Sequence, residues 1–178
     1  IYTNSGTDPY TNGSGSTMLG ENITNVNTVI GSANYDIGHV FSTGGGGVAQ
    51  LASVCSTPNG QGTSGKARGV TGSGAPVGDP FDIDYVAHEM GHQLGGPHTF
   101  NGSAGSCSGN ISSSTAMEPG SGSSIMAYAG ICSPQNVQNN SDEYYHAISL
   151  QNIKTFLSGT GSNCDIPVAG YNNSPPNI

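Results

Sequence analysis

One run of eleven residues, His88 to His98, constrains the fold of this chain more than any other feature. It reads H-E-M-G-H-Q-L-G-G-P-H and contains three of the five histidines. Helical residues four apart share one face, so His88 and His92 can offer two imidazoles to one ion. Gly95 can adopt the left-handed conformation that ends a helix, and Pro97 prevents the helix from resuming, so the chain turns back and brings in His98. Three neutral imidazoles with an open fourth position are the ligand set of a catalytic zinc site rather than a structural one.

Glu89 directly follows the first of these histidines. This position lies beside the metal, close enough for the carboxylate to act on a water but out of line for it to be a ligand. A carboxylate placed in this way can serve as a general base. The alternative, a solvated helix carboxylate without a role, is weak because the spacing of the histidines fixes the position of Glu89.

A second motif lies downstream, where residues Ser124 to Gly130 read S-I-M-A-Y-A-G. Together with H-E-x-x-H-x-x-G-x-x-H, it resembles the metzincins, a clan of zinc endopeptidases in which a methionine in a tight turn lies beneath the metal. The surrounding sequence most resembles the bacterial reprolysin-like secreted metallopeptidases. The resemblance is loosest in the first twenty residues and ends near Cys164. It implies that Met126 is the turn methionine, with a structural role; an ordinary core methionine is the alternative.

The resemblance implies a zinc metalloendopeptidase that hydrolyses peptide bonds by a metal-activated water, with Glu89 as the general base. In two branches, those similar to astacin and serralysin, a tyrosine two places after the methionine reaches the zinc and donates to the oxyanion. Tyr128 has that spacing and is a candidate catalytic residue, although reprolysins proper lack it and a packing role stays open. Thr99 stands where many reprolysins have an acid, so we expect no carboxylate there.

The glycine run at residues 44–47 is interpreted as a bend that lets a substrate backbone lie close to the following strand. An extended substrate would pair with that strand through backbone hydrogen bonds. The expected substrate-binding residues are Gly46, Gly47, Val48 and Ala49. Side-chain preference would come from a pocket bounded by residues 130–137.

Composition limits the partners. Eleven acids against three bases give a net charge of −8, which makes nucleic acid an improbable partner. Only 8% of residues are charged, and the polarity of the chain comes from Ser, Thr, Asn and Gly, which favours a loop-rich extracellular fold over disorder. No apolar run reaches the roughly 20 residues of a membrane helix. We therefore expect a monomer that acts on protein or peptide substrates and does not contact membranes.

Four dispersed cysteines indicate two disulfides and an oxidising compartment, hence a secreted, extracellular protein. Reduced, buried thiols are the alternative, and four cysteines allow three pairings. The resemblance implies Cys55–Cys164, because reprolysins tie the strand before the active-site helix to the end of the domain. We choose Cys107–Cys132 as the second pair because these residues flank the loop that carries Met126. Zinc is the expected cofactor; a calcium ion stays open, with no site assigned.

The resemblance implies an α+β, metzincin-like fold: a twisted, mostly parallel sheet, with the active-site helix over a loop-rich C-terminal subdomain. Apolar spacing predicts helices at 17–30 and 149–157 and an active-site helix capped by Asp82 or Asp84. Strands are predicted at 35–41 and 48–54, with a short piece around 67–70. Residues 1–164 would form the catalytic domain and residues 165–178, rich in Pro and Asn, a linker tail. The resemblance implies a sheet and two helices before the active-site helix, for which few residues precede His88. The domain is therefore either a compact variant or lacks its N-terminal strands and first helix; we expect the latter.

Two other classes stay open. One is an adhesive surface module with a vestigial zinc site, against which the retention of Glu89 argues. The other is a zinc hydrolase that acts on a non-peptide bond, against which the third histidine and the turn methionine argue together. His39 and His146 lie far from the motif and are expected to be ordinary hydrogen-bonded side chains.

Overall fold

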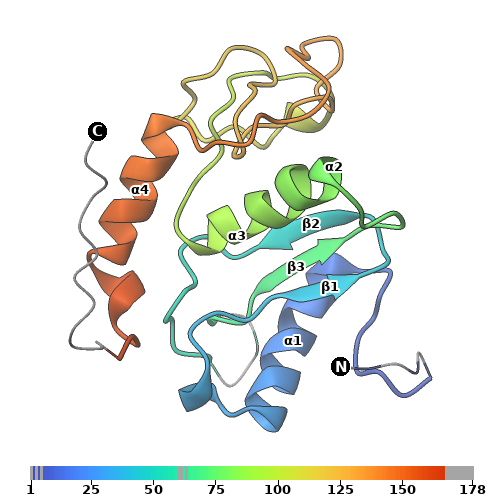
Figure 1. Ribbon diagram of the computed structural model, residues 1–178, viewed down its shortest axis with the longest axis vertical. Helices are drawn as coiled ribbons and strands as arrows, with labels where there is room; N and C mark the ends of the chain where they lie inside the picture. The colour runs from blue at the N-terminus through green and yellow to red at the C-terminus, as the bar shows by residue number, and fades with distance from the viewer. Residues whose placement is uncertain (1, 3, 5, 60–61, 63, 167–178) are drawn as a thin grey trace.

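The computed structural model describes residues 2, 4, 6–59, 62 and 64–166. A small sheet lies between two helical layers, with α1 on one face and the α2–α3 run on the other (Figure 1). The loops that follow lie on the side of the α2–α3 run away from the sheet, and helix α4 stands beside the end of α3. The architecture is therefore α+β, with a loop-rich C-terminal part as expected.

Helix α1 (Gly15–Val29) begins where the side chain of Ser14 accepts a hydrogen bond from the amide of Thr17. Its buried face includes Met18 and Leu19, which pack against Val70 of the sheet. Burial of this stripe is what attaches the helix to the sheet. The prediction of a helix at 17–30 is correct in type and late by two residues at its start, because the capping serine lies in a polar stretch.

The sheet has three strands, β1 (Val40–Ser42), β2 (Gly46–Ala49) and β3 (Gly69–Gly72), in the order β1-β3-β2. β1 runs parallel to β3, whereas β2 runs antiparallel to it. The expectation of a mostly parallel sheet is therefore wrong. Only residues 43–45 connect β1 to β2, and a parallel pair needs a crossover of about a dozen residues.

The strand predicted at 48–54 ends early. Ala52 and Cys55 have positive φ angles of 54° and 60°, which stop an extended strand. The amides of Ala52 and Ser53 instead donate to the carbonyls of His92 and Gln93, at 2.9 Å each. The Gln93 carbonyl, at the end of the active-site helix, thereby gains a hydrogen-bond partner from this segment.

The active-site helix is one run made of α2 (Asp79–Phe81), a π-helical segment (Asp82–Ala87) and α3 (His88–Gln93). It begins after Gly78, with Pro80 in the first turn, where the missing N–H of proline has no cost. The prediction that Asp82 or Asp84 caps the helix is wrong, because both lie inside it.

Residues 94–146 contain little regular structure, and helix α4 (Ala147–Leu157) follows them. Short 3-10 turns occur at Ser32–Asn34, Gly105–Cys107 and Thr160–Ser162. Helix α4, predicted at 149–157, begins at its His146 cap and packs on the turn that ends α3, where Phe156 lies against Gly95.

Two disulfides join Cys55 to Cys164 and Cys107 to Cys132, with Cα–Cα distances of 5.2 and 5.3 Å. These are the two pairs expected from the sequence. Apart from residues 165 and 166, the tail predicted at 165–178 lies outside the described residues. Within the described part of the chain, no helix is both long and apolar enough to cross a bilayer.

Candidate metal centre

The end of α3 determines where the third histidine lies. Gly95 has a φ of +93°, and its amide donates to the carbonyl of His92 at 2.9 Å, while the amide of Gly96 donates to the carbonyl of Gly91 at 2.8 Å. These two bonds form a Schellman motif, which reverses the chain after a helix. As a result, the Nε2 atoms of His92 and His98 lie 3.0 Å apart.

The three histidines offer ligand atoms that all lie within 4.8 Å of one another. The Nδ1 atom of each ring lies near a backbone carbonyl: that of Ile125 for His88 (2.7 Å), that of Gly96 for His92 (2.8 Å) and that of Asn110 for His98 (2.7 Å). A carbonyl only accepts, so each Nδ1 donates and each neutral ring keeps a lone pair on Nε2. The three lone pairs face one another.

This arrangement fits a divalent cation. Two lone pairs 3.0 Å apart repel each other unless a positive charge lies between them. The Nε2 atom of His88 is buried and has no hydrogen-bond partner among the described residues. Three imidazole nitrogens, each held by a carbonyl behind it, are typical of zinc, and zinc is the metal that these residues would hold.

Burial keeps the three rings neutral. Burial and, to a lesser extent, neighbouring histidines lower the pKa of His92 to about 4 and that of His88 well below its ordinary value. The pKa of His98 is also lowered by burial. Neutral imidazole is the form that binds a metal, so the site is prepared to bind at neutral pH.

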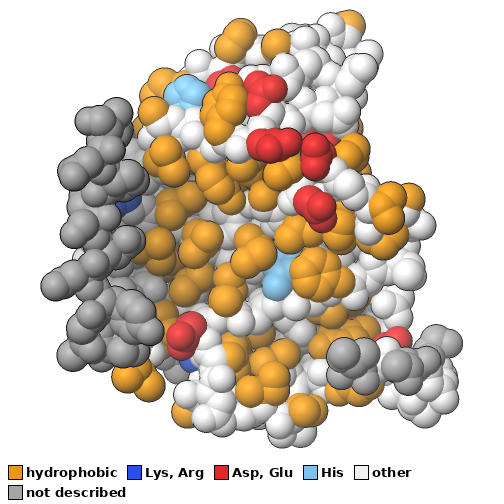
Figure 2. All heavy atoms as spheres, viewed as in Figure 1, with side chains coloured by type: hydrophobic (Ala, Val, Ile, Leu, Met, Phe, Trp, Pro, Cys, Tyr) orange, Lys and Arg blue, Asp and Glu red, His pale blue; other side chains and the backbone are white. Residues whose placement is uncertain are grey.

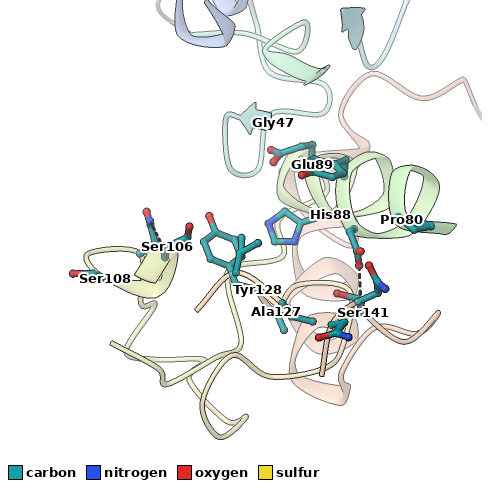
Figure 3. Close-up of a pocket in the computed structure, with 17 residues that line it drawn as sticks. Gly47, Pro80, His88, Glu89, Ser106, Ser108, Ala127, Tyr128 and Ser141 are labelled. Atoms are coloured by element: carbon teal, nitrogen blue, oxygen red, sulfur yellow. Dashed lines mark hydrogen bonds between the residues drawn. The ribbon is translucent and has the colours of Figure 1, made fainter. Parts of the chain in front are cut away.

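Glu89 lies on the same helix with its carboxylate packed against the backbone of Gly47, and a Cβ atom at residue 47 would overlap this carboxylate. Its side chain is 7% exposed, and the Oε2 atom has no hydrogen-bond partner among the described residues. Burial raises the pKa of Glu89 to about 8. A glycine in β2 therefore makes the space that the carboxylate occupies beside the histidines (Figure 3).

Met126 is fully buried beneath the helix. A Cβ atom at Gly91 would overlap its sulfur atom, so a glycine at that position lets the methionine turn approach the helix closely. Two hydrogen bonds connect the turn to the histidines. The Ile125 carbonyl accepts from His88, and the Met126 carbonyl accepts from the amide of Thr99, the residue after His98, at 3.2 Å.

Tyr128 lies on the opposite side of the site from the helix. Its ring centroid is 4.6 Å from those of His98 and Phe100 and 5.5 Å from that of His88. Figure 3 shows the hydroxyl directed towards the side of the pocket where Gly47 and Glu89 lie. Burial and the negative charge of Glu89 raise the pKa of Tyr128, so the hydroxyl carries its proton and can donate.

A pocket of about 530 Å³ opens beside His88 and Glu89 (Figure 3). Of residues 130–137, which were expected to form its wall, only Gly130 and Ile131 line the pocket, and residues 139–141 line it as well. Cys132 turns the chain away, since its side chain is held by the disulfide and its amide donates to Asn136. Val137 consequently lies elsewhere, 54% exposed.

Only one of the four predicted substrate-binding residues lines the pocket. Gly47 lines the pocket, whereas Gly46, Val48 and Ala49 continue along β2 beyond it. Because β2 is the last strand in the order β1-β3-β2, its outer edge pairs with no other strand of the described sheet. His39 and His146 are hydrogen-bonded side chains, as expected: His39 contacts Gln93 and Thr71, and His146 caps α4.

Glu118, a buried carboxylate next to Thr99, is a residue of the site that was not expected from the sequence. Glu118 is 7% exposed and accepts hydrogen bonds from the amides of Ser123 and Ser124 and from the Ser124 hydroxyl at 2.6 Å. Burial raises its pKa, but the bonds from Ser124, Thr99 and Ser123 lower it further than burial raises it. A distant loop thus places a buried carboxylate next to Thr99, and no local sequence pattern gives a signal for it.

Two comparisons with known proteins bear on the chain. A search of curated proteins finds no match. A family model described as Metallo-peptidase family M12B Reprolysin-like matches residues 1–155, which include both motifs and all three histidines. The resemblance seen in the sequence is confirmed: this chain belongs to the M12B reprolysin-like metallopeptidase family.

Proposed function

We propose that the protein is a secreted zinc endopeptidase of the metzincin clan, with His88, His92 and His98 as the zinc ligands. The observation that carries this proposal is the convergence of three Nε2 lone pairs, each fixed by a carbonyl behind its ring. When bound there, zinc supplies Lewis acidity to the reaction. Two disulfides fit an extracellular protein, and residues 1–164 would form the catalytic domain, followed by a linker tail.

Glu89 is the proposed general base. Its unpartnered oxygen lies beside the histidines at the wall of the pocket, where it can take a proton from the attacking water. The same carboxyl group then gives that proton to the leaving amine as the C–N bond breaks. Contact with Gly47 leaves the carboxylate little freedom to turn away, which lowers the cost of orienting it.

Tyr128 is the proposed donor to the oxyanion. Its protonated hydroxyl points into the pocket, and its ring is fixed between His98 and Phe100. Substrate would lie along the free edge of β2, with backbone hydrogen bonds to residues 46–49. Met126 would act only by packing beneath the metal.

The test separates ligand from base. His92→Ala should lose zinc and activity together, whereas Glu89→Gln should keep one zinc per chain and lose turnover by roughly a hundredfold or more. Zinc content is measured by elemental analysis and turnover with casein and quenched peptides. Casein cleavage by Glu89→Gln at the wild-type rate would contradict the proposed function.

Tyr128→Phe tests the oxyanion donor. It should keep zinc and ring packing and lower kcat roughly tenfold, with little change in KM, because the hydroxyl acts on the transition state. An unchanged kcat would leave Tyr128 with a packing role only.

A further inference from the structure

The pocket beside the metal centre contains a second carboxylate for which the proposed reaction has no use. Asp84 and Glu89 are the only acidic side chains among the residues that line it, and neither lysine nor arginine is present. Asp84 lies one helical turn before His88, so both side chains project from the same side of the helix. The pocket is therefore negative at the end away from Glu89.

No basic side chain among the described residues pairs with the charge of Asp84. Its Oδ1 atom accepts from the amide of Ser141 at 2.6 Å, the bond drawn at Ser141 in Figure 3. Across the described residues, Oδ2 accepts no hydrogen bond and no lysine or arginine forms an ion pair with Asp84. Two of the three bases are engaged elsewhere: Lys66 lies over the ring of Tyr35, and Arg68 donates to the carbonyl of Gly62.

The surface around the pocket has the same sign. Figure 2 shows several acidic side chains where Figure 1 places the start of the active-site helix, whereas lysine and arginine appear only as small areas away from it. Asp79 and Asp82 lie on this helix together with Asp84. With a net charge of −8, the protein as a whole attracts cationic peptides.

The walls suit a long basic side chain. Tyr85, Ala129 and Ile131 offer apolar surface to a methylene stem, and Asn139 and Asn140 offer amide oxygens near Asp84. A volume of about 530 Å³ lies within the range of pockets that enclose a ligand group. An acidic side chain would instead face Asp84 with like charge.

We propose that Asp84 makes this peptidase selective for lysine or arginine at a residue flanking the scissile bond. The inference rests on the proposed function and adds the class of substrate. The basic head would bind the free Oδ2 of Asp84, and the stem would pack along Tyr85 and Ile131. Charge-assisted hydrogen bonds of this kind discriminate against a neutral isostere, because the charge of the half-buried Asp84 is then left without a partner.

The variant Asp84→Asn isolates the charge. Asparagine has nearly the same shape, and its Oδ1 can still accept from Ser141, so the wall of the pocket is preserved while the charge is removed. Asp82→Asn is the matched control, because Asp82 lies two residues earlier in the same helical segment, is exposed and does not line the pocket. Thermal melts by circular dichroism establish that both variants are folded.

Zinc-loaded wild type is first profiled on a peptide library, and the position with the greatest enrichment of lysine or arginine is then tested with paired lysine and glutamine peptides. We expect the lysine peptide to be cleaved with a kcat/KM at least tenfold higher, mainly through KM. Asp84→Asn should lower this ratio about tenfold, and Asp82→Asn should leave it unchanged. A profile without basic enrichment, or a ratio unaffected by Asp84→Asn, would overturn the assignment.

Binding separates this inference from the proposed function. In zinc-loaded Glu89→Gln, calorimetry should show about tenfold tighter binding of the lysine peptide, a preference lost when Asp84→Asn is added. If wild type cleaves no peptide at all, the proposed function fails, yet this binding preference would still support the role of Asp84. Equal binding of both peptides would refute that role whatever the turnover.

Discussion

Two regions of this molecule hold their parts of the site in different ways. The described part of residues 15–93 forms two helical layers around a sheet. Hydrogen bonds between strands hold the backbone there, and apolar packing holds the side chains. Residues 99–146 contain little regular structure. There, polar side chains rather than neighbouring strands provide hydrogen-bond partners for the backbone. The Oε1 atom of Gln135, for example, accepts from the amides of Ser103 and Ala104.

The site lies where these regions meet. The first provides His88, His92 and Glu89, and the turn that follows α3 brings in His98. The loop region provides the carbonyls that orient the rings of His88 and His98. A loop can therefore position catalytic groups as firmly as a helix can, provided that its backbone groups have partners. Removing one bridge, contact or charge at a time shows which region depends on it.

Removing the disulfides should have the largest effect and should distinguish the regions. Cys55–Cys164 spans 109 residues and Cys107–Cys132 spans 25, so loss of the first should cost about 4–5 kcal/mol of unfolding free energy and loss of the second about 3 kcal/mol. Zinc affinity should nevertheless fall more for Cys107→Ser/Cys132→Ser, because that bridge closes the loop beneath the metal. Denaturant titration and zinc competition measure the two effects; equal losses of zinc affinity would show that the loop is held without its bridge.

Gly47→Ala should lower turnover roughly a hundredfold while leaving zinc bound, because the added Cβ displaces the carboxylate of Glu89. Gly45→Ala is the control, since a Cβ there meets nothing within 4 Å. Steady-state kinetics and zinc content are the measurements. Wild-type turnover in Gly47→Ala would mean that Glu89 acts from a different position.

Gly91→Ala tests the contact between the two regions. The added Cβ would overlap the sulfur atom of Met126 and approach the ring of Tyr145, so we expect a loss of about 2 kcal/mol in unfolding free energy. Gly74→Ala, in open space, should have little effect. If both variants unfold at the same denaturant concentration, the methionine turn can move away from the helix without a loss of unfolding free energy.

Glu118→Gln should have the smallest effect and should depend on pH. The pKa of Glu118 is lowered in the folded protein, so its contribution to stability is full at neutral pH and is lost as pH falls below about 4.5, its ordinary value. The variant should lose about 1 kcal/mol at pH 7 and progressively less in acid. Unfolding titrations across pH check this, with exposed Glu143→Gln as control; a loss that does not change with pH would exclude a role for the charge.

Much of the centre could be predicted from sequence, because its geometry is local. The spacing of His88, His92 and Glu89 follows from helical periodicity, and Gly95 and Pro97 dictate the reversal that follows. Apolar periodicity likewise predicted α1 and α4 to within two residues. The start of the active-site helix was predicted too late because aspartate is a favoured N-cap residue, and Asp82 and Asp84 lie near the helix start. Gly78 and Pro80, where the helix actually begins, are weaker sequence signals.

The sequence by itself thus determined the family and the three histidines that could hold a metal ion, and it pointed to Glu89 as the proposed general base. The tertiary structure alone decided the antiparallel direction of β2, the use of Glu118 next to Thr99, the contact of Gly47 with Glu89 and the wall formed by residues 139–141. Each of these depends on groups far apart along the chain. Local spacing specifies which residues share a helical face, but contacts between distant segments depend on how the whole chain packs and on which buried polar groups find partners.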